Sequence, residues 1–190
     1  MHTPLQDQLV PTLESARLHL RPFAASDAQA LYAYASDGET VKHLTWAAHA
    51  SVQESEGTIQ TILSHKGVYA IVLKESNHLI GCIDLRILTP SEASFGYVLN
   101  RAFWNKGYTT EALQTALSYL FAEVGIKTVV GCHERDNPAS KAVMKKCGMR
   151  WTHLAKDETI SGKTTDNDHY LITSDEWLLR SEQEKKHPLI

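Results

Sequence analysis

The pattern of apolar and polar positions predicts that strands and helices alternate along the first third of the chain. The run RLHLRPF, residues 17–23, alternates polar and apolar residues as a strand with one buried face does. The segment SDAQALYAYAS, residues 26–36, has apolar residues at helical spacing and begins with a capping Ser26 or Asp27. A second helix is predicted over residues 51–64, because three of its apolar residues share one side, namely Ile59, Ile62 and Leu63.

Three β-rich runs follow the second helix. Residues 69–75 (YAIVLKE) and 79–88 (LIGCIDLRIL) carry many β-branched and apolar side chains, which is typical of strands. The short connection between them, residues 76–78, predicts that the two strands form a hairpin. The run EASFGYVL, residues 92–99, is the third predicted strand.

The clearest helical signal covers residues 109–124. Apolar residues form one stripe along this segment, so one side of the helix should face the core. Gly125 comes next, and glycine commonly ends a helix. The apolar stripe consists of Ala112, Leu113, Ala116, Leu117, Leu120, Phe121 and Val124.

A strand and a short helix are predicted next. Residues 127–133 (KTVVGCH) form a nearly continuous apolar run, which predicts a strand buried on both faces. Residues 136–148 (DNPASKAVMKKCG) predict a helix with start and stop signals at both ends. Asn137 is its expected cap, Pro138 lies in its first turn and Gly148 ends it.

The end of the chain predicts two more strands, near residues 151–155 and 168–173, and then a polar C-terminal tail over residues 174–190. The order of elements, β-α-α-β-β-β-α-β-α-β-β, predicts a mixed α/β (α+β) fold with a right-handed strand–helix–strand crossover in its middle. A chain of 190 residues is interpreted as a single domain, residues 1–190, whose core covers about residues 17–173.

Composition and charge exclude several classes of protein. With 43% hydrophobic and 22% charged residues, the chain has the composition of a globular protein with a substantial core. The net charge of −3 and the scattered Lys and Arg residues predict no nucleic-acid partner. No apolar run is long enough to span a membrane, and the N-terminus lacks a signal-peptide pattern. Cys82, Cys132 and Cys147 have no metal-ligand spacing, so we expect no metal site and free thiols in a cytoplasmic protein.

The segment NRAFWNKGYTTEAL, residues 100–113, joins a glycine-containing turn to a helix start. Unpaired N–H groups and the positive end of the helix dipole attract phosphate at such a start. Gly107 would let the backbone approach an anion closely, and Lys106 adds positive charge. Thr109 and Thr110 can cap the helix or donate to phosphate oxygens. An ordinary Thr-capped turn is the alternative, since neither a P-loop nor a three-glycine dinucleotide motif is present.

Three stretches together resemble the GNAT acetyltransferase superfamily, specifically its RimJ/RimL-like branch. The branch opens with a T-x-R-L-x-L-R strand and an acid-led helix, and here the chain reads LESARLHLRPFAASDAQAL. Its acetyl-CoA segment has a G-Y-x-L strand and then W-G-K-G-Y-A-T-E-A, which corresponds to FGYVLNRAFWNKGYTTEAL. Its N-x-x-S-x-x-V-x-x-K-x-G-F segment corresponds to NPASKAVMKKCGM. The resemblance covers about residues 17–173.

The chain departs from this pattern at three positions. Asn105 stands where glycine is common, and Thr109 stands where glycine or alanine usually lets the cofactor pass. The Thr109 hydroxyl can replace a lost contact by donating a hydrogen bond. Met149 replaces a phenylalanine, which is an exchange between apolar residues.

The resemblance implies one GNAT-type domain with a mixed, mostly antiparallel central sheet, flanked by helices. Its central strands splay and hold acetyl-CoA between them, and CoA is the product. The loop before the long helix would bind the pyrophosphate, and amides near the end of strand 92–99 would bind the pantetheine arm and polarise the acetyl oxygen. The implied cofactor-binding residues are Val98, Leu99, Trp104, Asn105, Lys106, Gly107, Tyr108, Thr109, Thr110, Asn137 and Ser140.

The resemblance also implies the catalytic residues. Ser140 would face the CoA sulfur and donate a proton to the leaving thiolate, while Asn137 would bond the pantetheine; a simple helix cap and a first-turn hydroxyl explain both residues equally well. Glu158 stands where relatives carry a glutamate that acts as base through water. A solvated hairpin is the alternative for this polar segment, and the competing bases are Asp157, Asp168 and His169.

The implied reaction is transfer of an acetyl group to a primary amine by direct attack on the thioester. The branch favours the α-amine of a protein N-terminus, such as that of a ribosomal protein. A small amine, either an antibiotic or a polyamine, is the alternative acceptor, and a non-catalytic CoA-binding module is the alternative class. The retained pair Ser140 and Glu158 favours an enzyme. The resemblance is compatible with a monomer and with a homodimer.

Overall fold

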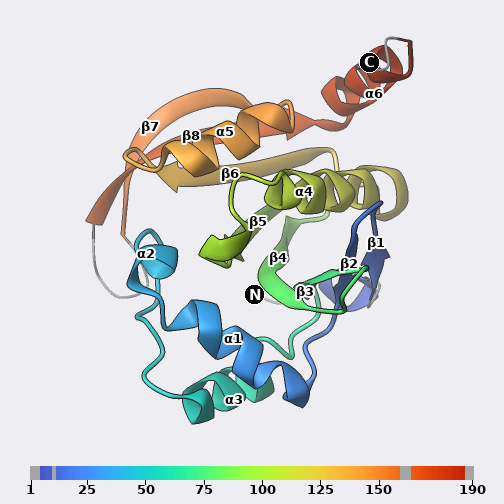
Figure 1. Cartoon of the computed structure of the whole chain (residues 1–190). Coiled ribbons are helices and arrows are strands. Elements are labelled where there is room, and N and C mark those ends of the chain that lie inside the picture. The colour runs from blue at the N-terminus through green and yellow to red at the C-terminus, as the bar shows by residue number, and fades with distance from the viewer. Residues whose placement is uncertain (1–4, 10–11, 159–163, 187–190) are drawn as a thin grey trace.

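The computed structural model of the protein describes residues 5–9, 12–158 and 164–186. Its strands form one sheet in the order β1-β2-β3-β4-β5-β6-β8-β7, with helices on both faces (Figure 1). The pair β5–β6 is parallel and the other neighbouring strands are antiparallel, which confirms the predicted mixed, mostly antiparallel sheet. The strands are β1 (Leu13–Glu14), β2 (Leu18–Arg21), β3 (Val68–Leu73), β4 (Leu79–Thr89), β5 (Glu92–Leu99), β6 (Thr128–Glu134), β7 (Arg150–Glu158) and β8 (Thr164–Thr173).

Helices α1 and α3 lie on one face of the sheet, and α4 and α5 lie on the other (Figure 1). The helix α6 follows β8 at the C-terminal end of the chain. Among the described helices, none combines the length and apolar character that crossing a membrane requires. The helices are α1 (Ala28–Ala35), α2 (Gly38–Val41), α3 (Val52–Thr61), α4 (Tyr108–Tyr119), α5 (Pro138–Lys146) and α6 (Ser174–Lys186).

Each face of the sheet has its own hydrophobic core. Successive residues of a strand point to opposite faces, so Ile71 and Val72 of β3 belong to different cores. Val72 joins the cluster that includes Leu31 of α1, and Ile71 joins the cluster that includes Leu113 of α4. Burying one such side chain stabilises a fold by roughly 1.5–3 kcal/mol. The two amphipathic helix faces therefore hold the sheet between them.

The first two helices form where predicted, with two differences. The carboxylate of Asp27 does not cap α1; it accepts a hydrogen bond from the amide of Ala24 at 2.7 Å and pairs with Arg21 at 2.7 Å. A 3₁₀ turn over Ala25–Asp27 leads directly into α1, so no cap position is left for this side chain. In the second helix, Ile62 lies past the end of α3 and is 63% exposed, so it does not share the buried side with Ile59.

The long helix begins at Tyr108 and changes its hydrogen bonding before it ends. Regular α-helix stops at Tyr119, and a π-helical turn continues over Leu120–Val124. Gly125 follows in the left-handed conformation, with φ of 81°, which confirms the predicted stop at this glycine.

Strand β6 is wrongly predicted as buried on both faces. Val129 is buried, but Cys132 is exposed. The pairing of β5 with β6 covers residues 92–94 of β5 and 128–130 of β6, and beyond them the two strands separate. The second half of β6 therefore has a strand neighbour on its β8 side alone within the described chain, and this separation is the splay that the family resemblance implies.

The segment predicted as a polar tail contains the helix α6. The ring of Trp177 packs against Phe121 with centroids 6.3 Å apart. The carboxylate of Glu176 accepts a hydrogen bond from the Thr173 amide at 2.8 Å and pairs with Arg150 at 2.9 Å. One aromatic contact and these polar contacts order a helix whose sequence is otherwise polar. The strands β7 and β8 are longer than predicted, and residues 159–163 between them lie outside the described residues.

Candidate functional site

The turn before α4 has two residues in the left-handed conformation. Asn105 has φ of 60° and Gly107 has φ of 81°, so the backbone is left-handed on both sides of Lys106 just before the helix starts. Asparagine is the side-chain-bearing residue that tolerates this conformation best, together with aspartate. Asn105 therefore fits the position where the family pattern has glycine. The turn leaves the first N–H groups of α4 without helical partners, at the positive end of its dipole.

The carboxylate of Glu111, in the first turn of α4, anchors this turn to the start of β2. It accepts hydrogen bonds from the Ser15 hydroxyl at 2.7 Å, from the Arg17 amide at 2.8 Å and from Nε of Arg17 at 2.6 Å. Burial acts to raise the pKa of Glu111, but these hydrogen bonds outweigh it and lower the pKa below its usual value. Nη1 of Arg17 also donates to the Lys106 carbonyl at 3.1 Å.

Arg17 and Glu111 had no predicted role in the site, although both stand in the motifs that carry the resemblance. The Arg17 guanidinium also lies 4.4 Å from the centre of the Tyr108 ring, a cation–π contact. Tyr108 is therefore held by Arg17. Nζ of Lys106 lies 5.2 Å from the centre of the Phe103 ring, so its charge stays beside the turn.

The end of β5 is held by a side chain of the same loop. The indole Nε1 of Trp104 donates a hydrogen bond to the Leu99 carbonyl at 2.7 Å. Val98 and Leu99 pair with Cys82 and Gly81 of β4, and on the other side β6 has already turned away. The predicted roles of Val98 and Leu99 in binding the cofactor arm remain predictions, and both residues do lie in the splayed part of the sheet.

The first turn of α5 faces this gap. Oδ1 of Asn137 accepts a hydrogen bond from the Ser140 amide at 3.1 Å, which confirms Asn137 as the helix cap. The Tyr97 hydroxyl of β5 donates to the Ser140 carbonyl at 3.4 Å and so joins α5 to the splayed strand. Within the described chain the Ser140 hydroxyl makes no hydrogen bond, and it stays available to a ligand. Tyr97 had no predicted role either, because its partner lies 43 positions away along the chain.

The predicted base candidates lie in different surroundings. Glu158 is exposed at the outer end of β7. Oδ2 of Asp157 accepts from Nδ2 of Asn167 at 2.8 Å and lies 2.8 Å from Nε2 of His169. The hydrogen bond from Asn167 is the largest cause of the lowered pKa of Asp157; slight burial opposes it, and His169 adds to the lowering. Alternation along β7 turns Glu158 away from this group, toward the α5 face.

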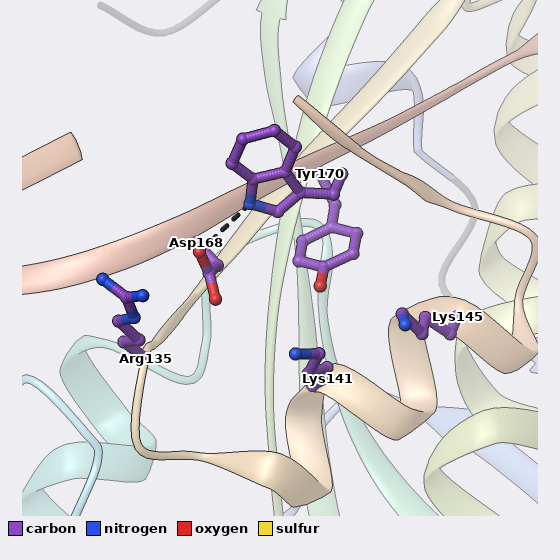
Figure 2. A pocket seen from close by; sticks show the side chains of 6 residues that line it. Arg135, Lys141, Lys145, Asp168 and Tyr170 are labelled. Carbon is purple, nitrogen blue, oxygen red and sulfur yellow. Dashed lines mark hydrogen bonds between the residues drawn. The ribbon is translucent and has the colours of Figure 1, made fainter. Parts of the chain in front are cut away.

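Asp168, the remaining candidate, lies on the α5 face of β8. Its Oδ1 accepts a hydrogen bond from Nε1 of Trp151 at 3.0 Å, drawn as a dashed line in Figure 2. The two side chains border an open hollow of about 420 Å³. Figure 2 shows lysines of α5 along one edge of it, and the lining residues are Arg135, Lys141, Lys145, Trp151, Asp168 and Tyr170.

Two clusters bring together side chains of the metal-ligand type that have no regular spacing in the sequence. Ligand atoms of Cys132, Asp157 and His169 lie within 4.8 Å of one another. Nδ1 of His43 lies 2.6 Å from the Glu134 carboxylate in the other cluster. Each cluster satisfies part of its own polar groups through these hydrogen bonds. Sequence spacing could not reveal them, because the first joins three strands and the second joins β6 to the segment after α2.

Sequence comparison identifies relatives over most of the chain. Residues 17–150 match the family model described as an acetyltransferase (GNAT) domain. YnaD of Bacillus subtilis, named as an uncharacterized N-acetyltransferase, is 30% identical over 171 residues, which cover 87% of this chain and 98% of the relative. The FsC-acetyl coenzyme A-N(2)-transacetylase of Aspergillus fumigatus is 26% identical over 88% of this chain and 78% of its own length.

Solved structures share the fold. An acetyltransferase of the GNAT family from Bacillus anthracis superimposes with a TM-score of 0.78 at 24% identity and covers 86% of this chain and 99% of its own. The ribosomal-protein α-N-acetyltransferase RimL, in complex with coenzyme A, has a TM-score of 0.72 at 23% identity, over 85% of this chain and 97% of its own. The microcin self-immunity acetyltransferase MccE, in complex with acetyl-CoA and AMP, has a TM-score of 0.72 at 23% identity, over 84% and 93%. The chain thus belongs to the GNAT family and is an N-acetyltransferase.

Proposed function

We propose that this N-acetyltransferase transfers the acetyl group of acetyl-CoA to the α-amine of a protein N-terminus, as a member of the RimJ/RimL-like branch. The observation that carries the proposal is the splay of β5 from β6, which opens beside the left-handed turn at Asn105 and Gly107. One end of this arrangement can bind an anion, and the other exposes strand groups and the Ser140 hydroxyl.

The residues present fit coenzyme A. Its diphosphate needs N–H donors that are already aligned, and the left-handed turn before the twelve-residue helix α4 offers them and contains Lys106. Its pantetheine arm is a chain of amides, which can hydrogen-bond to an unpaired strand edge as a neighbouring strand would. Residues 95–99 of β5 provide such an edge after the pairing with β6 ends.

Acetyl-CoA supplies an activated acetyl group, and the chain must orient the amine and manage its protons. An ammonium group must lose a proton before it can attack. Glu158 is the proposed acceptor of that proton, through water, and its exposure allows the proton to pass on to solvent. Ser140 is the proposed donor to the leaving sulfur, because its hydroxyl lies in the first turn of α5 without another partner in the described chain.

The charge near the end of β6 favours a cationic acceptor. A hollow of about 380 Å³ lies there, lined by Glu134, Arg135, Asp136, Thr165 and Asp166. The Glu134 carboxylate is paired with His43, and two further carboxylates face one guanidinium, so the hollow keeps an excess of acidic groups that would attract an ammonium group. Arg135 and Asp136 are exposed, and such an open hollow suits the end of a peptide chain.

A small amine is the second candidate acceptor. The support is the name of the relative FsC-acetyl coenzyme A-N(2)-transacetylase, which names FsC and mentions no protein N-terminus. The negative hollow would also attract a polyamine or a cationic antibiotic. The free cysteines at positions 82, 132 and 147 support a cytoplasmic, reducing compartment for either activity.

An acceptor screen tests the proposal directly. The purified protein is incubated with acetyl-CoA and a panel of N-terminal peptides, polyamines and aminoglycosides, and products are identified by mass spectrometry. We expect acetylated peptide α-amines, with a rate that falls in Ser140→Ala and a pH–rate profile that shifts in Glu158→Gln. If the protein acetylates small amines and no peptide, the proposed N-terminal acceptor is wrong and the small amine is the acceptor.

A further inference from the structure

His133 of β6 has a buried ring nitrogen that the reaction described so far does not use. The residue is 5% exposed. Its Nδ1 lies 2.8 Å from the carbonyl oxygen of Glu134. Its Nε2 is shielded from solvent and has no hydrogen-bond partner in the described structure. Buried polar atoms are nearly always paired, so this one calls for an explanation.

The partner of Nδ1 determines where the proton of the neutral ring sits. A carbonyl oxygen can accept a hydrogen bond but cannot donate one. Nδ1 must therefore carry the proton in the hydrogen bond to Glu134, and the neutral imidazole keeps a bare lone pair on Nε2. A histidine held in this tautomer presents a proton acceptor in a fixed direction.

His133 lies where β5 and β6 separate beneath α5. Gly131, two residues earlier on the same face of β6, is so tightly covered that a Cβ built on it would lie 2.6 Å from Cζ of Phe95 and 3.4 Å from Cε of Met144. Phe95 stacks on Tyr97, with ring centroids 5.9 Å apart, and Tyr97 reaches the Ser140 carbonyl. His133 is thus one strand step beyond the Phe95 layer, on the face that carries Ser140.

The groups around the ring leave Nε2 as its free acceptor. The ring of Tyr170 lies against it, with centroids 5.4 Å apart. Asp168 is its cross-strand neighbour on β8, and the carboxylate of that residue is engaged with the Trp151 indole. Protein atoms shield Nε2 on all sides in the structure, so acetyl-CoA and the amine would have to reach it through the gap where the two strands separate.

We propose that His133 is the internal proton relay of acetyl transfer, an inference that rests on the proposed function. An ammonium acceptor sheds two protons, and Glu158 passes the first to solvent. When the neutral amine attacks, a C–N bond forms and the C–S bond breaks, and Nε2 of His133 takes the second proton from nitrogen. Ser140 gives its proton to the sulfur and recovers one from the imidazolium. Both side chains return to their starting state, and the products are the amide and CoA thiol.

Two kinds of base suit two different protons. The first proton has to leave the protein, and an exposed carboxylate such as Glu158 exchanges it with water. The second proton is needed again at the sulfur, a few bonds from where it was lost. A base shielded from water keeps that proton inside the site, and the burial of Nε2 provides the shielding.

Two substitutions at position 133 separate a relay from a hydrogen-bond acceptor. His133→Asn can keep the donor to the Glu134 carbonyl and removes Nε2. His133→Gln can place an oxygen near the Nε2 position, but that oxygen cannot carry a proton through the reaction. We expect both variants to lower the single-turnover acetyl-transfer rate by about 10²-fold or more, with CoA affinity by calorimetry unchanged. His65→Gln, an exposed histidine before β3, is the matched control and should retain the wild-type rate.

A measurement on the wild-type protein tests the inference without relying on activity. Nitrogen NMR of labelled histidine should show His133 protonated at Nδ1 and bare at Nε2, with the Nε2 signal moving when CoA is added. The opposite tautomer, or no response to CoA in protein that binds it, would overturn the relay, as would a wild-type rate in His133→Gln. Failure of the proposed function is a different result, in which wild-type protein binds no CoA or acetylates no N-terminal peptide.

Discussion

Nε of Arg17 donates a hydrogen bond to Oε2 of Glu111 at 2.6 Å, and this contact joins the entrance of β2 to the first turn of α4 across 94 positions of sequence. The same guanidinium reaches the Lys106 carbonyl and lies on the Tyr108 ring. Arg17 therefore stabilises the turn before α4 through three contacts: the Glu111 carboxylate, the Lys106 carbonyl and the Tyr108 ring. A turn that is already ordered loses less entropy when it binds a ligand.

Removing Arg17 should weaken coenzyme A binding more than it destabilises the fold. The Arg17 side chain is 47% exposed, so solvent screens the ion pair and we expect Arg17→Ala to cost about 1 kcal/mol or less in unfolding free energy. CoA affinity should fall several-fold by calorimetry, because the turn is no longer held. Arg150→Ala is the matched control, since it removes an exposed arginine that pairs with Glu176 of α6 and not with the turn before α4. Equal loss of CoA affinity in both variants would contradict the role of Arg17.

We expect the contribution of Glu111 to the free energy of unfolding to decrease as the pH falls. Its pKa is lowered in the folded protein, so its contribution is fully present above the unfolded pKa, about 4.3, and is lost as the pH falls through the lower folded value. Glu111→Gln should therefore be less stable than wild type at neutral pH, with a difference that shrinks on acidification. Urea unfolding at a series of pH values measures this, and a pH-independent difference would show that the carboxylate charge is not what stabilises the turn.

The elements that the sequence predicts well are those with local signals. Strand β5 has the predicted bounds, and α5 begins after Asn137 and ends before Gly148 because its cap, its proline and its glycine all act within a few residues. Phe95 packs over Gly131 just where the pairing of β5 with β6 ends, and spacing along the chain does not encode this contact. For that reason β6 was predicted as a fully buried strand.

The candidate site was likewise predicted only where its signals are local in the sequence. The turn around Lys106 was identified because it is one short stretch of chain. The contact of Glu111 with Arg17 beside this turn was missed, and the contact of Asp157 with His169 on β7 and β8 was left open, because both pairs form only in the fold. His133 carries no sequence signal of a role, and its burial and single hydrogen bond become visible only in the fold.

At the two left-handed residues of the turn, alanine should lower the stability of the fold and glycine should not. A Cβ on Gly107 would lie 3.5 Å from Nη2 of Arg17, so space is available and conformational strain alone should decide the effect. We expect Gly107→Ala and Asn105→Ala each to destabilise the fold by roughly 1–2 kcal/mol, the cost of the left-handed conformation for an ordinary residue. Asn105→Gly should be tolerated, with unchanged CoA affinity. Thermal unfolding and calorimetry measure both effects, and a destabilised Asn105→Gly variant would show that the Asn105 side chain has a role of its own.

Asn137 can be tested for its two roles separately. Oδ1 of Asn137 caps α5 through the Ser140 amide, so Asn137→Ala should lose about 1 kcal/mol of stability. Asn137→Asp keeps a capping oxygen and should restore that stability, but it lacks the amide group that could donate to the pantetheine arm and adds a negative charge. If Asn137 also binds the arm, Asn137→Asp will fold like wild type and still bind CoA more weakly by calorimetry. Full recovery of both stability and affinity in Asn137→Asp would mean that capping is the whole function of this residue, and the cofactor contacts at α5 would then have to come from Ser140 and the backbone.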